Sequence, residues 1–370
     1  MKRLSVVLLS LLLVACSEVT APAPASEAEL NRGMRGAPSF ELTDLGTLGG
    51  NAAFALGINN RGDIVGTSRL TSSARPQLAF LAERGSSELR DLGTLDGSTF
   101  SRAFRVNQSG EAVGEAFTPA GASRAVLWRN GELEELAPGV SAVANDINNR
   151  GQVVGTSGGQ AVLWDRGTMT ALGAISNDPA ATSRGNAIAE NGRVVGLAQT
   201  DILSEFGSRV SHAFLWDGRR MIDLGALADP TNFSVAYGVN PRSEVVGESV
   251  VGGGTYHAFV WRNGSMRDIH PAELGIRHSR ANDINASGDI VGWVSTFFGF
   301  PTFGAAAAVL WRDGVAHDLN ALVEAEGWDL RAAMGINDRG QIVGYGLKDG
   351  QTRAFLLEPA AGSRGVAPGL

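Results

Sequence analysis

The sequence predicts an all-β fold, a seven-bladed β-propeller of four-stranded blades closed by an N-terminal strand. Three observations lead to this prediction. An N-x-x-G-x-[IV]-V-G pattern recurs in seven units at a mean period of about 46 residues, each unit carries four short apolar runs, and an unpaired fourth-strand motif precedes the first unit. Four-stranded units at this period are typical of propeller blades, and an open β-solenoid is the alternative fold.

The first and second strands of each unit are joined by the N-x-x-G turn. The pattern lies at 59–66, 107–114, 148–155, 285–292 and 337–344, with Ala112 at the [IV] position of the second copy. Asparagine favours the first turn position, and glycine supplies the left-handed residue that follows a type I turn. In the two degenerate copies, Ala189 replaces the asparagine and Ser243 replaces the glycine.

The third and fourth strands have motifs of their own. The third strand reads A-[FV]-[LV]-W and ends in a tryptophan, at Trp128, Trp164, Trp216, Trp261 and Trp311. The fourth strand is D-L-G-like, as at 91–93 and 223–225, and short R-N-G or R-D-G hairpin signals precede it. Because the tryptophans recur at one strand position, we expect them to pack between blades.

The two ends of the chain predict how the ring closes. The seventh unit stops after its third strand, at 353–357, and a D-L-G-T-L segment at 44–48 stands alone before the first unit. If that segment supplies the fourth strand of the seventh blade, no sheet edge stays open between the blades. An open solenoid would not explain this segment.

The N-terminus has the pattern of an export signal. Lys2 and Arg3 precede an apolar run at 4–14, which is too short to span a bilayer but suits a signal-peptide core. The following L-V-A-C stretch resembles the lipobox of bacterial lipoproteins. That resemblance implies that Cys16 is lipidated and becomes the mature N-terminus, and Ser17 after it implies the outer membrane. An ordinary secretory signal is the alternative.

These patterns divide the chain into four segments. From Ser17 onward the chain is rich in Ala, Pro, Ser and Glu, as in a flexible tether. The predicted segments are a lipoprotein signal peptide at 1–15, a tether at 16–39, the propeller at 40–359 and a disordered tail at 360–370.

Several of the repeated motifs resemble a known family. The H-A-F-[LV]-W strands at 212–216 and 257–261 look like the motif of the HAF family of bacterial extracellular repeats. D-L-G-T-L-G-G at 44–50 and D-I-N-N-R-G-Q-V-V-G at 146–155 are similar to its other signatures. The resemblance covers 40–359 and implies an exported repeat protein, with no particular activity or ligand. Several copies carry Arg or Ala in place of the histidine, so a catalytic role at that position is not expected.

Composition excludes several classes of function. A net charge of −7 argues against a nucleic-acid-binding protein. A single cysteine rules out an intrachain disulfide and a cysteine-based zinc site. The 44% share of hydrophobic residues excludes a disordered polar chain.

The connections of variable length point to a binding face. They lie at 67–77, 174–184, 197–211, 270–280 and 295–307. In an antiparallel four-stranded blade, second-to-third loops and blade-to-blade loops emerge on the same face, and variable loops on a rigid scaffold often carry binding. We therefore expect a non-catalytic binding or scaffold protein of the cell envelope that recognises a glycan or a protein on this variable-loop face. A third hypothesis is a purely structural component of the cell envelope.

Candidate residues on this face fall into two groups. Binding candidates are Tyr256, Arg280, Phe297, Phe298, Phe300 and Phe303. A propeller enzyme, a lyase or hydrolase, is the alternative function, with His257, His270, Glu273 and His278 as acid–base candidates.

No metal or other cofactor is expected, because the histidine spacing matches no zinc motif. Calcium is the alternative cofactor. Its candidate oxygen ligands are Asp283, Asn285 and Asp289, although asparagine at that position also recurs as turn chemistry.

Overall fold

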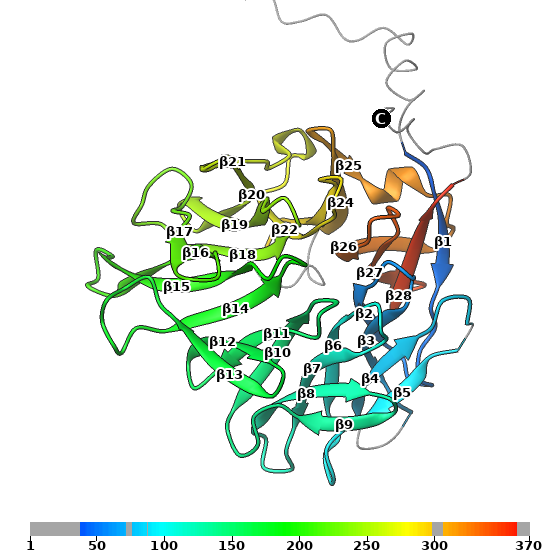
Figure 1. Ribbon diagram of the computed structural model, residues 1–370. Helices are drawn as coiled ribbons and strands as arrows, with labels where there is room; N and C mark the ends of the chain where they lie inside the picture. Colours follow the sequence, from blue (N-terminus) through cyan, green and yellow to red (C-terminus); the bar gives the residue numbers. More distant parts are fainter. Residues whose placement is uncertain (1–37, 72–75, 87, 298–305, 361–370) are drawn as a thin grey trace, which may run out of the picture. The chain divides into compact units, whose positions relative to one another are not determined.

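The computed structural model describes residues 38–71, 76–86, 88–297 and 306–360. Its strands form seven four-stranded antiparallel sheets arranged in a ring, a seven-bladed β-propeller (Figure 1). The predicted fold class is therefore confirmed, with one sequence repeat contributing to each blade. The proposed lipidation site, Cys16, lies outside the described residues, as do the signal peptide and nearly all of the tether and tail.

Blades 1 to 3 each consist of four consecutive strands. Blade 1 contains β2 (Ala53–Ile58), β3 (Ile64–Arg69), β4 (Gln77–Ala82) and β5 (Arg90–Gly93). Blade 2 contains β6 (Ser101–Val106), β7 (Ala112–Phe117), β8 (Ser123–Arg129) and β9 (Glu132–Glu135). Blade 3 contains β10 (Ala142–Ile147), β11 (Val153–Ser157), β12 (Gln160–Asp165) and β13 (Thr168–Gly173).

Blades 4 to 6 follow the same order. Blade 4 contains β14 (Ser183–Ile188), β15 (Val194–Leu203), β16 (Arg209–Trp216) and β17 (Met221–Asp223). Blade 5 contains β18 (Ser234–Val239), β19 (Val245–Gly252), β20 (Thr255–Arg262) and β21 (Ser265–Asp268). Blade 6 contains β22 (His278–Ile284), β23 (Ile290–Ser295), β24 (Ala306–Arg312) and β25 (Val315–Asp318). Short 3₁₀ helices, Ala272–Leu274 and Leu319–Leu322, precede and follow blade 6.

Blade 7 combines strands from both ends of the propeller, as predicted. It contains β26 (Trp328–Ile336), β27 (Ile342–Lys348), β28 (Gln351–Pro359) and β1 (Phe40–Asp44). β1 pairs antiparallel with β28, and the blue and red strands lie side by side in Figure 1. The strand begins before the predicted D-L-G-T-L segment at 44–48 and ends at its first residue, Asp44; the N–H of Leu45 still donates to Ala354, and Gly46 then adopts a left-handed φ of 75°.

The asparagine of the N-x-x-G turn links each blade to the next. In blade 1, the Asn59 carboxamide oxygen accepts hydrogen bonds from the N–H groups of Arg61, Gly62 and Asp63, and this fixes the turn. Its Nδ2 donates to the carbonyl of Asn107 in blade 2 at 2.9 Å. Equivalent bonds run from Asn107 to Asn148, Asn148 to Ala189, Asn240 to Asn285, Asn285 to Asn337 and Asn337 to Asn59. The turns therefore form a hydrogen-bonded ring that is interrupted at Ala189.

Substitution of Ala189 should complete this ring. We expect Ala189→Asn to raise the free energy of unfolding by about 1 kcal/mol, the usual net contribution of one hydrogen bond. The backbone of Ala189 already makes the same turn hydrogen bonds as the asparagines. We therefore expect the side-chain amide of an asparagine at this position to reach the carbonyl of Asn240 in the next blade. Urea unfolding measures the change. The control is Ala189→Ser, whose hydroxyl can accept turn hydrogen bonds but which carries no amide, and equal effects of the two substitutions would contradict the prediction.

A β-bulge and a glycine shape the inner edge of each blade. The register of every first strand shifts between the residues four and two positions before the turn asparagine (Ala189 in blade 4), for example between Ala55 and Gly57 in blade 1. Opposite it lies the glycine of the V-V-G strand. A Cβ on Gly66 would lie 2.0 Å from the carbonyl oxygen of Phe54, and the other six V-V-G glycines meet the same obstacle at 1.9–2.0 Å. Each blade therefore has one position with room for glycine only.

The core lies between neighbouring blades. Val65 and Leu81 of blade 1 share a buried cluster with Trp128 of blade 2, which is 3% exposed. Trp164 and Trp311 are buried in the same way, while Trp216 and Trp261 are half-buried against other clusters. Among the described residues, no helix is long and apolar enough to cross a membrane.

Candidate functional site

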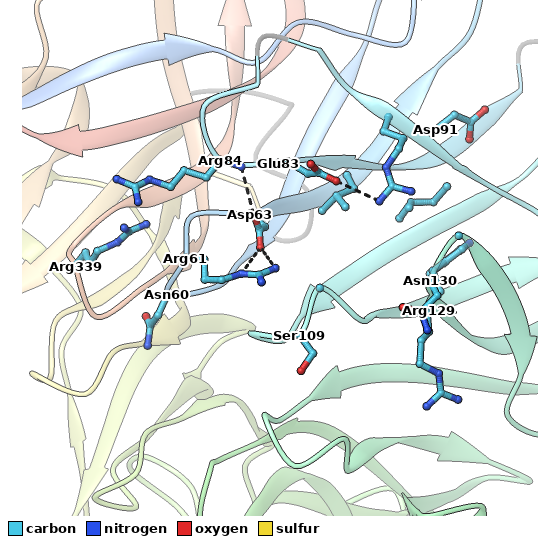
Figure 2. Close-up of a pocket in the computed structure, with 16 residues that line it drawn as sticks. Asn60, Arg61, Asp63, Glu83, Arg84, Asp91, Ser109, Arg129, Asn130 and Arg339 are labelled. Atoms are coloured by element: carbon cyan, nitrogen blue, oxygen red, sulfur yellow. Dashed lines mark hydrogen bonds and ion pairs between the residues drawn. The ribbon is translucent and has the colours of Figure 1, made fainter.

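An arginine-lined groove lies between blades 1 and 2, on the face that carries the first-to-second and third-to-fourth turns. We call this the short-turn face. The groove has a volume of about 950 Å³. Its lining, hereafter the arginine groove, is drawn in Figure 2 and consists of Asn60, Arg61, Asp63, Leu81, Glu83, Arg84, Arg90, Asp91, Leu92, Ser109, Gly110, Trp128, Arg129, Asn130, Gly131 and Arg339. Five arginines thus face three carboxylates in a protein with a net charge of −7.

Three of these arginines are neutralised by carboxylates. Arg61 contacts Asp63 at 2.6 Å, Arg90 lies 3.6 Å from Glu83, and Arg129 contacts Glu134 at 2.9 Å. Burial opposes ionisation of Asp63, but hydrogen bonds from Asn59 and Arg61 outweigh it and lower the pKa of Asp63. Asp63 is therefore charged at neutral pH and holds Arg61 in place.

The other two arginines have no carboxylate partner among the described residues. Within the described part of the chain, the guanidinium of Arg339, from blade 7, donates to the amide oxygen of Gln341 alone, at 2.6 Å. No described side chain accepts a hydrogen bond from Arg84, whose backbone N–H donates to Asp63. Both side chains lie against Gly62: a Cβ built there would be 2.6 Å from Nη2 of Arg339 and 3.5 Å from Cγ of Arg84. Figure 2 labels both side chains at the edge of the groove.

A second groove occupies the equivalent place between blades 5 and 6. It measures about 390 Å³, and Arg242, Arg267 and Trp311 occupy the positions that Arg61, Arg90 and Trp128 have in the arginine groove. Its lining has three arginines against four carboxylates, together with His270. The fold thus repeats the position of the groove, at a smaller volume and without the excess of arginines.

The histidines predicted as acid–base candidates lie around the boundary of blades 5 and 6. The rings of His257 and His270 are stacked with centroids 3.9 Å apart. Nδ1 of His257 contacts Asp268 at 2.7 Å, while Nδ1 of His270 lies 2.8 Å from the hydroxyl of Ser279. Nδ1 of His278 accepts a hydrogen bond from a backbone N–H at 3.2 Å, and Glu273 is exposed on the 3₁₀ helix.

Other blades show structural counterparts of these histidine contacts. The His257–Asp268 pair repeats His212–Asp223 of blade 4, at 2.9 Å, and both pairs join a third strand to a fourth strand. His270 stands where other blades have the D-L-G glycine, whose carbonyl accepts from an equivalent serine, as Gly93 does from Ser101. These histidines therefore complete contacts that other blades make without them.

The chemistry of His270 follows from this arrangement. The Ser279 hydroxyl has no exposed surface and shares a hydrogen bond with Nδ1 of His270. Burial, followed by the charge of His257, lowers the pKa of His270. Burial, followed by the charge of Arg277, also lowers the pKa of His278.

The predicted binding residues do not converge on one described cavity. Arg280 makes two hydrogen bonds of 2.8 Å to Glu248, which is 2% exposed, and its guanidinium stacks on Tyr237 and Trp293. Tyr256 packs against Phe233 and His278. Phe297 is 61% exposed, whereas Phe298, Phe300 and Phe303 lie outside the described residues.

The oxygen-bearing residues considered for calcium have separate partners. Asn285 caps its turn, Asp289 pairs with Arg312 at 2.7 Å, and Asp283 faces Arg105 at the ring axis. Within the described ranges, no group of three or more His, Cys, Asp or Glu side chains is arranged to hold a metal ion.

A charged triad spans the centre of the ring. Arg105 of blade 2 lies 4.0 Å from Asp146 of blade 3 and 3.9 Å from Asp283 of blade 6. Blades 2 and 6 are not neighbours, so this arginine reaches across the axis. Each aspartate also accepts a backbone N–H from the following blade, Ile188 and Ile336 respectively. Burial raises the pKa of Asp146 to about 6 and also raises the pKa of Asp283.

The arginine groove was not among the sites predicted from the sequence. Its residues come from positions that differ between repeats. Loop-length variation predicted binding on the variable-loop face, which is not the face of the short turns. One signal was present: arginine occupies the third position of several turns, at Arg61, Arg150, Arg242 and Arg339.

Several solved structures share the propeller fold. The β-propeller domain of the Trilobed protease from Pyrococcus furiosus, described as having an open velcro topology, is 13% identical with a TM-score of 0.50, over 73% of this chain and 84% of that chain. A puromycin-hydrolyzing peptidase of Mycobacterium tuberculosis is 10% identical with a TM-score of 0.53, over 89% of this chain and 55% of that chain. TolB from Acinetobacter baumannii is 11% identical with a TM-score of 0.43, over 92% and 86% of the two chains.

These similarities concern the fold alone. This chain spans about half the length of the mycobacterial peptidase. No protein-family model matches the chain, and a search of curated proteins finds no match.

Proposed function

We propose that this protein is an exported β-propeller, anchored through Cys16 in the outer membrane, that binds an acidic oligosaccharide in the arginine groove without catalysing a reaction on it. The observation that carries the proposal is the cavity of about 950 Å³ in which Arg84 and Arg339 have no carboxylate partner among the described residues. The L-V-A-C stretch and the resemblance to HAF repeats support the export and the anchor.

The lining favours a ligand with spaced negative charges. Guanidinium groups donate paired hydrogen bonds to carboxylate, sulfate or phosphate groups. Asp63, Glu83 and Asp91 line the same groove and would repel a densely charged polyanion. Asn60, Ser109 and Asn130 supply amide and hydroxyl groups for sugar hydroxyls. An oligosaccharide with one acidic group per sugar satisfies all three conditions.

The proposal places the ligand on the short-turn face rather than on the variable-loop face expected from the sequence. The reason is charge. The groove between blades 5 and 6 occupies the equivalent place but has four carboxylates against three arginines, so the positive lining is not a property of the repeat. An excess of arginines in one of two equivalent grooves favours a role of these arginines in binding over a role in stabilising the fold.

Binding of trigalacturonate to the full chain tests the proposal. We expect calorimetry to detect trigalacturonate but not neutral maltotriose, with affinity that falls as salt rises. Arg90→Gln should weaken binding about tenfold, the loss of one charge-assisted hydrogen bond.

The matched control is Arg267→Gln, which makes the same change at the equivalent position of the other groove and should leave affinity unchanged. No binding of the acidic trisaccharide, or an equal effect of both substitutions, would overturn the proposal. Preference for a glutamate tripeptide would show that the ligand is an acidic peptide and would equally count against it.

A further inference from the structure

We infer that Arg84 and Arg339 form a subsite for a single oxyanion, and that a ligand bound there fastens the seam between the first and last blades of the ring. The inference rests on the proposed function of the arginine groove and names the point at which the acidic group binds. It also adds a consequence for the fold that binding elsewhere in the groove would not have.

The subsite arises from one difference between equivalent turns. In blades 1 and 5 the arginine at the third turn position pairs with a carboxylate two residues later, Asp63 for Arg61 and Glu244 for Arg242, at 2.6 and 2.7 Å. In blade 7 the corresponding residue is the neutral Gln341, so the charge of Arg339 is oriented but not neutralised.

A second positive charge lies beside the first. Arg84, on the hairpin after β4, packs against the same glycine, Gly62, as Arg339 does. Two guanidinium groups repel each other, and an anion between them removes that repulsion while accepting hydrogen bonds from both. Carboxylate, sulfate and phosphate oxygens share this chemistry.

The two arginines lie on opposite sides of the seam. Arg84 belongs to blade 1 and Arg339 to blade 7, which contains the last three strands of the chain. Polar contacts across this seam on the short-turn face include the bond from Asn337 to the carbonyl of Asn59 and the pair formed by Asn60 and Asp338. An oxyanion held by both arginines would add a bridge to these contacts.

Affinity measurements on the full chain test the subsite. We expect Arg84→Gln and Arg339→Gln each to weaken binding of the tightest probe about tenfold. The probes are trigalacturonate, N-acetylglucosamine 6-sulfate and inorganic phosphate, and their order identifies the oxyanion. The control is Arg242→Gln, the same change at the same turn position of blade 5, where Glu244 neutralises the arginine. If Arg90→Gln weakens binding while neither Arg84→Gln nor Arg339→Gln does, the subsite is wrong but the proposed function stands.

Hydrogen exchange tests the seam. The amide of Asp338 donates to Asn60 across the boundary of blades 7 and 1, and the amide of Gln108 donates to Asn149 at the boundary of blades 2 and 3. At a ligand concentration ten times its Kd, exchange at Asp338 should slow about tenfold, because opening the seam would release the ligand. Exchange at Gln108 should not change. Binding that slows neither amide, or both equally, would overturn the fastening of the seam, whereas failure of every probe to bind would overturn the proposed function itself.

Discussion

Replacing Arg105 with methionine is expected to lower the free energy of unfolding at pH 8 by about 3 kcal/mol, the cost of removing one partner from a buried ion pair. Without its guanidinium, Asp146 and Asp283 remain as two buried carboxylates near the ring axis. Each keeps its backbone hydrogen bonds, so the loss is electrostatic and not a loss of packing.

The destabilisation by Arg105→Met should depend on pH, and the direction follows from the pKa of Asp146. Burial raises the pKa of Asp146 to about 6 in the folded protein, from a reference value of 3.8. Between these values the folded protein holds a proton that the unfolded chain has released, so this group's contribution to stability is present at pH 4 and lost as the pH rises through 6. Without Arg105 the pKa rises further, and the deficit of Arg105→Met should therefore be smaller at pH 5 than at pH 8.

Urea unfolding at the two pH values measures both effects. The control is Arg129→Met, which removes an arginine that is about half exposed and pairs with Glu134, and which should cost at most about 1 kcal/mol. Replacing Asp146 and Asp283 with asparagine in the Arg105→Met background should restore most of the loss. A deficit that is the same at pH 5 and pH 8 would show that packing, and not charge, is responsible.

Replacing Phe40 with alanine should lower the free energy of unfolding by about 3 kcal/mol, because a buried ring leaves a cavity at the closing strand. Phe40 is 5% exposed and packs in the cluster that contains Leu330 and Leu357 of blade 7. Its strand is the outermost of that blade, pairs along its length with β28, and forms one further bridge, from Phe40 to Val323. Loss of the side chain should therefore also weaken that pairing.

The change in the free energy of unfolding and the weakening of the β1–β28 pairing can be measured separately. Urea unfolding gives the first, and hydrogen exchange of the β1 and β28 amides gives the second. Phe206→Ala is the matched control, because Phe206 is 85% exposed and its removal should change stability by less than about 0.5 kcal/mol. Equal effects of the two substitutions would mean that β1 is not required to hold blade 7 together.

The repeat pattern predicted most of the fold because it records constraints that act within one blade. Turn chemistry at Asn59 and the glycine at Gly66 are local requirements, and each is met again in the later repeats. The closing strand was also predictable, since the seventh repeat lacked a fourth strand and the first had one to spare. The ring of asparagine hydrogen bonds could not be predicted, because a turn motif does not reveal that the side-chain amide of its asparagine reaches the next blade.

The candidate site was harder to predict because it depends on what differs between repeats. Arg84 and Arg339 are far apart in the sequence, and only ring closure brings both against Gly62. The acid–base role considered for His257 and His270 stays a prediction. Their partners Asp268 and Ser279 continue contacts found in other blades, which the residue types alone did not indicate. The charged triad was indicated by the sequence, since Arg105, Asp146 and Asp283 all stand two residues before the turn asparagine.

The pairing of β1 with β28 has a consequence for the order of events during biogenesis. Residue 40 leaves the ribosome, and any export channel, long before residue 359, with which it must pair. Blades 1 to 6 can each form from contiguous sequence as they emerge, but blade 7 waits for the end of the chain. Closing so long a loop is a slow step, although its entropic cost grows only with the logarithm of length. Until the last strands are available, blades 1 to 6 form an unclosed stack with an uncovered blade at each end, and that interval is when aggregation would threaten the chain most.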